Sequence, residues 1–187
     1  MGFFNQENEQ VNKTVLKESK RKRWIIHGAR ATNVFLPPQF QRPTRDWDLW
    51  SRRSLQDSKE LKDELNKNCP SCYCESSIPL EDSNQTVYRV VDCRTGHEVA
   101  DFMCMPSKTK NLYKLIGGVR YETLEHAKLQ YKEILNNPRL RHRHQKSLLD
   151  LQRIEAFERS LKKGEPIKKV EYPFRMFQFK PMRIGSW

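Results

Sequence analysis

Apolar and polar residues form patterns typical of β-strands in three stretches of the chain. Residues 24–27 are aromatic and β-branched, as in a short buried strand, and this run stops at Gly28. Residues 44–50 alternate between polar and apolar, which predicts a second strand. Residues 86–105 contain two apolar runs on either side of Gly96, and this arrangement predicts a β-hairpin.

Apolar residues spaced three to four positions apart predict helices elsewhere. Such spacing is found in 51–68, in 123–135 and again from Asn137 to about Lys163. Residues 29–36 have the length of two helical turns and end at two prolines. The chain therefore combines a small sheet with several helices.

The two ends of the chain differ in composition from its middle. The first 13 residues are polar without periodicity, and the last 23 are basic, aromatic and interrupted by prolines. Such a tail either stacks on bases or docks on a protein surface, and the prolines favour docking. We therefore predict four parts: a polar and basic N-terminal arm (1–23), an α/β core (24–110), a helical subdomain (111–164) and a basic aromatic C-terminal tail (165–187).

The charge of the chain indicates an anionic partner. Its 187 residues include 35 Lys and Arg against 23 Asp and Glu, a net charge of +12. A surplus of this size favours nucleic acid, triphosphates or another polyanion. The basic run 20–23 is either a nucleic-acid or localisation patch or the solvated end of a helix, and the sequence leaves both open.

The sequence predicts an intracellular, reducing location: cytoplasm, nucleus or the inside of a virus particle. No stretch approaches the roughly 20 apolar residues that a membrane span needs, and the N-terminus lacks the pattern of a signal peptide. The five cysteines are therefore expected to be thiols. Cys69, Cys72 and Cys74 suggest zinc, but without a second well-spaced pair we favour cysteines packed as small hydrophobic residues.

Asp46 and Asp48 alternate with apolar residues, so they share one face of the predicted strand. Their Cα atoms are then about 6–7 Å apart. Neighbouring carboxylates repel each other and stay ionised only beside a compensating cation. Mg²⁺ suits the pair, since it binds one or two carboxylates together with phosphate oxygens. A strand end with two solvated aspartates is the alternative.

Two further features support a phosphate and metal site. The strand–Gly–helix junction at Gly28 directs backbone N–H groups toward whatever lies above the strand, and Arg30 adds a positive charge. Asp101 lies within the apolar second run of the hairpin, where a carboxylate is costly unless it has a partner. A metal ion would provide that partner, and a hydrogen-bonded aspartate on an open face is the alternative.

These motifs together resemble the nucleotidyltransferase superfamily of the DNA polymerase β type. Its members carry a hydrophobic residue and Gly followed by Gly or Ser, then two acids around a hydrophobic residue, then a third acid on a later strand. Gly28, the segment TRDWD at 44–48 and Asp101 match this pattern, most similarly to compact or viral poly(A)-polymerase-like members. The resemblance implies an α+β fold: a small mixed β-sheet flanked by helices, then a C-terminal helical pair and an extended tail.

The resemblance also implies a reaction, the transfer of a nucleoside monophosphate from NTP to a hydroxyl group on RNA or protein, with two Mg²⁺ (or Mn²⁺) ions. It implies that Asp46 and Asp48 hold the metals and that Asp101 completes the site and activates the acceptor hydroxyl. The candidates for nucleotide binding are Gly28, Ala29, Arg30, Thr44, Lys128 and Lys146, with Asp150 as a secondary position. For the residues on the helices, a solvated amphipathic face is the alternative.

One position departs from the family pattern. Residue 29 is Ala where the family has Gly or Ser, which removes a hydroxyl group from the phosphate loop. The first hypothesis is a metal-dependent nucleotidyltransferase that binds NTP. The alternative is an inactive protein of the same fold that binds nucleic acid or serves as a structural component of an assembly such as a virion, with protein partners holding its two tails.

Overall fold

A seven-stranded mixed sheet lies at the centre of the described part of the chain, in the order β3-β4-β5-β2-β1-β7-β6. The computed structural model describes residues 3–80, 85–107 and 111–163. The strands are β1 (Ile25–His27), β2 (Trp47–Ser51), β3 (Tyr73–Pro79), β4 (Thr86–Asp92), β5 (His97–Cys104), β6 (Tyr113–Ile116) and β7 (Val119–Glu122). The helices are α1 (Phe3–Lys22), α2 (Gly28–Phe35), α3 (Ser54–Asn66), α4 (Leu124–Asn136) and α5 (Arg141–Lys163), with short 3-10 turns η1 (Pro38–Phe40) and η2 (Pro138–Leu140).

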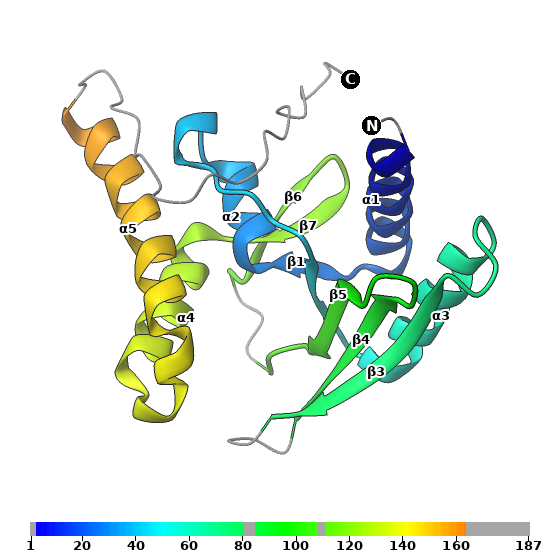
Figure 1. Cartoon of the computed structure of the whole chain (residues 1–187). Helices are drawn as coiled ribbons and strands as arrows, with labels where there is room; N and C mark the ends of the chain where they lie inside the picture. Colours follow the sequence, from blue (N-terminus) through cyan, green and yellow to red (C-terminus); the bar gives the residue numbers. More distant parts are fainter. Residues whose placement is uncertain (1–2, 81–84, 108–110, 164–187) are drawn as a thin grey trace.

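Two groups of helices cover the sheet from opposite sides (Figure 1). Helices α1 and α3 lie on one side, where Val15 and Leu61 are fully buried in a cluster with Phe102 of β5. Helices α2, α4 and α5 lie on the other, where Tyr131 and Ile154 form a second apolar cluster. The predicted α+β fold with a C-terminal helical pair is therefore confirmed.

Strand β2 shows why the alternating pattern predicted the sheet correctly. Trp47 and Leu49 are buried in the cluster beneath α1 and α3, and each such side chain contributes about 1.5–3 kcal/mol by leaving water. Because successive side chains point to opposite faces, Asp48 is directed to the other side of the sheet. The apolar residues of β2 thus fix the side on which the carboxylate lies.

The N-terminal segment predicted as an arm is instead the 20-residue helix α1. It buries Thr14, Val15, Glu18 and Ser19, which recur three to four positions apart as on one helix face. Three of these four residues are polar, so the hydrophobic pattern gave no sign of a packed helix. The basic run at 20–23 proves to be the end of this helix and the residue after it.

Residues 111–164, predicted as a helical subdomain, begin with a β-hairpin that belongs to the central sheet. Strands β6 and β7 pair around Gly117 and Gly118, both at positive φ, and β7 pairs with β1 in parallel. A strand of four residues is too short to show a clear alternation in sequence. The two strands were not predicted.

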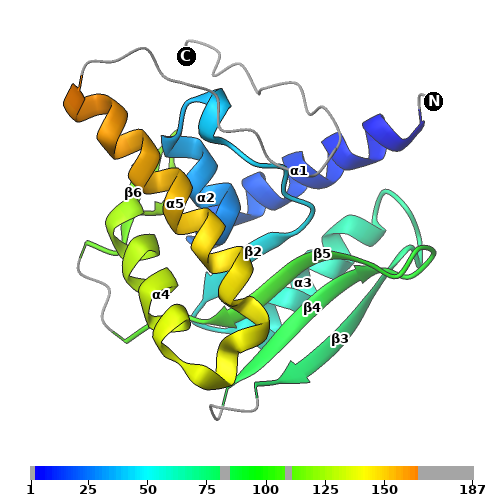
Figure 2. The same cartoon turned by 60° about the vertical axis from the view of Figure 1, so that its left-hand side comes forward.

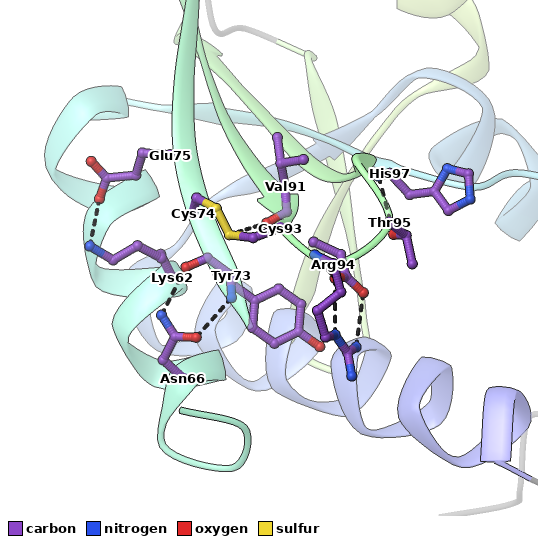
Figure 3. The surroundings of a disulfide bond; sticks show 11 residues. Lys62, Asn66, Tyr73, Cys74, Glu75, Val91, Cys93, Arg94, Thr95 and His97 are labelled. Carbon is purple, nitrogen blue, oxygen red and sulfur yellow. Dashed lines mark hydrogen bonds and ion pairs between the residues drawn. A yellow bond between two sulfur atoms is a disulfide. The ribbon is translucent and has the colours of Figure 1, made fainter. Parts of the chain in front are cut away.

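The prediction of five free thiols is wrong for four of them. Cys69 is bonded to Cys72, and Cys74 to Cys93, while Cys104 is free and exposed. Figure 3 shows the second disulfide, which links β3 to the turn after β4. Spacing along the chain did not reveal this pair, because the antiparallel pairing of β3 with β4 brings together residues 19 positions apart.

The described helices include none that is long and apolar enough to cross a membrane. The predicted tail at 165–187, with its aromatic and basic residues, lies outside the described residues.

Candidate active site

Four polar side chains lie next to one another on four neighbouring strands. The strand registers place Arg89 opposite Asp101, Asp101 opposite Asp48, and Asp48 opposite His27. Residues directly opposite each other in a sheet point to the same face. The result is a row of adjacent polar side chains across β4, β5, β2 and β1, which we call the polar row. Figure 2 shows the neighbouring strands β3, β4 and β5 of this sheet.

Gly28 follows the polar row directly and is in contact with it. Its φ of +67° is a left-handed conformation that side chains rarely adopt. A Cβ atom at this position would be 2.4 Å from Oδ2 of Asp48. Both the backbone conformation and the neighbouring carboxylate therefore require glycine here. The first turn of α2 is held directly against Asp48.

The backbone N–H of Gly28 is already engaged by the protein itself. It donates to Oε2 of Glu122 at 3.1 Å, and the other oxygen of that carboxylate lies 2.6 Å from Nδ1 of His126. Glu122 is 1% exposed. A buried carboxylate thus occupies the first amide of the loop that was predicted to cradle a triphosphate.

Asp48 lies in surroundings that disfavour its ionised form. Burial, and after it the neighbouring charge of Asp46, raise the pKa of its carboxyl to about 6. The positive charges of Lys146, Arg143 and Arg42 act in the opposite direction and lower this pKa. The structure therefore places Asp46 and Lys146 within electrostatic reach of Asp48, together with two arginines that the sequence pattern did not indicate.

Asp101 lies beside a cationic side chain of the neighbouring strand. Arg89 on the adjacent strand lies with Nε 3.2 Å from Oδ1 and Nη2 3.3 Å from Oδ2. Burial nevertheless raises the pKa of Asp101 to about 7. The positive charge of Arg89 only partly offsets the effect of burial, and the negative charge of Asp48 raises the pKa as well. Arg89 also pairs with Glu98 at 2.5 Å. The ion pair with Arg89 is thus the compensation that the sequence left open.

His27 closes the row as a neutral side chain. Burial lowers its pKa to about 4, against the attraction of Glu122, so it carries no charge near neutral pH. Its ring stacks on Trp50 with the centroids 4.1 Å apart. Its Nε2 atom has no hydrogen-bond partner among the described residues. The histidine therefore adds no positive charge to balance Asp48.

The donor set fits a divalent cation in part. The carboxylates of Asp46 and Asp48 form no ion pair or hydrogen bond with other described residues, and one or two carboxylates with phosphate oxygens are what Mg²⁺ requires. Within the described ranges, however, no group of three or more His, Cys, Asp or Glu side chains could hold a metal ion. Asp101, bound by Arg89, does not complete a three-carboxylate set in this arrangement.

Comparison with solved structures decides the fold. The Megavirus polyadenylate synthase superimposes with a TM-score of 0.65 at 16% identity, over 94% of this chain and 35% of that one. The chain has a nucleotidyltransferase fold. Two Helicobacter pylori structures, a presumed nucleotidyltransferase and JHP933, give TM-scores of 0.48 and 0.46 at 12% and 13% identity, over 87% of this chain and 80% and 78% of theirs. Scores below 0.5 support no inference.

The structural similarity to the Megavirus protein shows the fold and nothing further. At 16% identity it establishes the nucleotidyltransferase fold alone, and the chain spans about a third of the Megavirus protein's length. No protein-family model matches the sequence, and no curated protein gives a significant match.

Of the predicted nucleotide-binding residues, Arg30 lies within electrostatic reach of Asp46 and Asp48, whereas Lys128 lies on α4 and Thr44 in the loop before β2. The guanidinium group of Arg30 donates to the carbonyl oxygen of Asp46 at 2.6 Å and lies 4.0 Å from the ring centroid of Trp47, so it fixes the entry to β2. Lys128 pairs with Glu158 across α4 and α5 at 2.7 Å. Thr44 is half-buried in the loop before β2.

Asp150 joins α5 to the loop that leads into β2. It is 2% exposed and accepts hydrogen bonds from Arg42 at 2.7 and 3.0 Å and from Arg153 at 2.7 Å. Arg153 also donates to the side chain of Asn33 and the carbonyl of Phe40, both at 3.0 Å. This buried network holds α5, and with it Arg143 and Lys146, beside the polar row. No local spacing in the sequence links these residues.

Proposed function

We propose that the chain is a metal-dependent nucleotidyltransferase that moves a nucleoside monophosphate from NTP to a hydroxyl group on RNA or protein. The observation that carries the proposal is the placement of Asp48 opposite Asp101 and against Gly28 on a nucleotidyltransferase fold. This placement of the acids on such a fold does not favour the alternative of an inactive structural component.

Asp46 and Asp48 are the residues that would hold the divalent cation. Their carboxylates have no competing partner among the described side chains, and their mutual repulsion is relieved when a cation binds. When held there, Mg²⁺ would supply positive charge to the transferring phosphoryl group and to the leaving pyrophosphate. The raised pKa of Asp48 means that cation binding at neutral pH also displaces a fraction of a proton.

The triphosphate would bind between the Gly28 turn and α5. Arg143 and Lys146 act electrostatically on Asp48, and their charges suit an anion placed over the same carboxylate. The N-terminal turn of α2 adds the partial positive charge of its amides. Because Glu122 already accepts from the N–H of Gly28, the side chains of α5 carry much of this role.

Asp101 would accept the proton of the acceptor hydroxyl. It neighbours Asp48 across the parallel strand pair, and a pKa of about 7 matches a general base that works near neutral pH. Arg89 limits this role in the arrangement seen here, because its guanidinium group donates a hydrogen bond to Oδ2 of Asp101 and lies 3.2 Å from Oδ1. Release of Asp101 from Arg89 is therefore part of the proposal.

The test is a transfer assay with labelled NTPs, Mg²⁺ or Mn²⁺, and RNA, DNA and protein acceptors. The wild-type chain is compared with Asp48→Asn, which removes the charge and keeps the shape. Asp92→Asn is the matched control: it alters an aspartate of the same sheet that pairs with Arg94 outside the polar row. Labelled product with wild type and control, but not with Asp48→Asn, supports the proposal. Absence of both product and NTP binding with either metal refutes it.

A further inference from the structure

A basic cavity lies at the ends of the central strands β1, β2 and β5, away from the polar row. It has a volume of about 430 Å³ and is lined by nine residues, among them Trp24, Ser51, Asp57 and Met105. Ser51 ends β2, three residues beyond Asp48, which places it about 10 Å away along the strand. The cavity is therefore separate from the acids of the candidate active site.

Five of the nine lining residues are cationic: Lys22, Arg23, Arg52, Arg53 and Arg120. Some are already compensated, since Lys22 pairs with Glu60, and Arg53 lies 3.3 Å from Asp57. The guanidinium groups of Arg23 and Arg52 form no ion pair or hydrogen bond with other described residues, and both side chains are exposed. The cavity thus keeps an excess of positive charge that no described acid neutralises.

The position of Arg23 is unusual for its residue type. It follows the last residue of α1 with a φ of 61°, and the N–H of Trp24 returns to the carbonyl of Ser19 at 3.1 Å. Glycine is common at such a helix end because other residues lose about 1–2 kcal/mol in the left-handed conformation. An arginine here places a guanidinium group at the cavity despite that cost.

The distribution of positive charge indicates an extended anion. The positive charge continues beyond the cavity along the last turn of α1, where Lys20 lies against Gly118 so closely that a Cβ there would be 2.7 Å from Cε. A row of cations longer than the cavity suits a chain of phosphates better than one phosphorylated small molecule.

We propose that this cavity, with Arg23 and Arg52 as its main contacts, binds the phosphate backbone of single-stranded nucleic acid. The site acts through charge, so it recognises the strand without reading its sequence. It requires neither the metal nor NTP. The proposal therefore stands or falls separately from the transfer reaction.

The test is the salt dependence of binding, measured by fluorescence anisotropy with a labelled single-stranded oligouridylate of about 12 nucleotides. The full chain is titrated in EDTA, without NTP, over about 0.05–0.3 M KCl. The test variant is Arg23→Asn/Arg52→Gln, in which Asn tolerates the left-handed backbone. The control, Lys132→Gln/Arg159→Gln, removes the same charge from exposed positions on α4 and α5 outside the cavity.

Each phosphate contact with a single strand adds about 0.7 to the slope of log affinity against log salt. Loss of two contacts is expected to reduce the slope by about 1.4 and the affinity at 0.1 M salt by about 25-fold. The control should keep both values, and Arg23→Lys/Arg52→Lys should restore most of the slope. Thermal unfolding confirms that each variant is folded.

Two outcomes would overturn the proposal. Equal losses in the cavity variant and the control, or no loss in either, would show that the cavity makes no specific contact. If AMP or pyrophosphate binds as tightly as the oligouridylate and loses affinity in the cavity variant, the cavity is a small-ligand site instead.

Discussion

Replacing Asp48 by Asn should make the protein more stable while it removes transfer activity. Asp48 lies between Asp101 and His27 in the polar row, and no described residue pairs with its carboxylate. Its pKa is raised to about 6, first by burial and then by Asp46. The side chain is therefore retained at a cost to folding, which is expected of a residue kept for a ligand.

The magnitude follows from the shift of this pKa. The unfolded value is 3.8 and the folded value is about 6, a difference that corresponds to about 3 kcal/mol at 1.36 kcal/mol per unit. Between these two values the native carboxyl holds a proton that the unfolded chain has released, so stability falls as pH rises through this window. Asparagine carries no charge. Because Asp48 is partly exposed to solvent, we expect Asp48→Asn to raise the free energy of unfolding above about pH 7 by about 2–3 kcal/mol.

Urea unfolding followed by circular dichroism measures this gain at about pH 8, 6 and 4. The gain should shrink on acidification and vanish below about pH 4, where both carboxyls are protonated. Asp92→Asn is the control with the opposite sign, because a hydrogen bond from Arg94 lowers the pKa of Asp92 and its loss should destabilise the fold at about pH 8. An Asp48→Asn protein that is no more stable than wild type at about pH 8, or equally stabilised at both ends of the range, would refute the reasoning.

Four further predictions concern the polar row and its support. Mg²⁺ at about ten times its Kd should raise the stability of wild type by about 1.4 kcal/mol, and calorimetry of Asp48→Asn should show no such effect. Gly28→Ala should lower the urea midpoint by the equivalent of at least 1–2 kcal/mol and abolish transfer, since its Cβ collides with Asp48. Arg89→Gln removes the charge that lowers the pKa of Asp101, so the rise of transfer activity near about pH 7 should move to higher pH. Asp150→Asn leaves two arginines without their buried partner, and chemical denaturation should report a loss of about 3–5 kcal/mol.

The central strands could be predicted because their burial follows the sequence closely. In β2 and β5 the buried residues Leu49 and Phe102 alternate with the aspartates, so a period of two was visible without a structure. Helix α1 lacked any such signal, since its buried face includes Thr14, Glu18 and Ser19. The sequence pattern thus reported burial only where the buried residues were apolar.

The candidate site was predictable in its acids and not in their partners. Asp46, Asp48 and Asp101 stand out because carboxylates are rare within apolar runs. Arg89 became a partner of Asp101 through strand register, and Glu122 reached Gly28 from a residue 94 positions away. Register and long-range packing depend on the whole fold, and local spacing carries no information about them.

The contacts of Gly28 bear on how this chain would recognise a triphosphate. A helix N-terminus binds anions through its first free amides, but Glu122 has taken the N–H of Gly28, and Ala29 offers no hydroxyl group in compensation. The positive charges of Arg143 and Lys146, which act on Asp48 from α5, are not subject to either restriction. We therefore expect phosphate recognition to depend more on these side chains than on the backbone loop. Their substitution should weaken NTP binding while leaving the polar row intact.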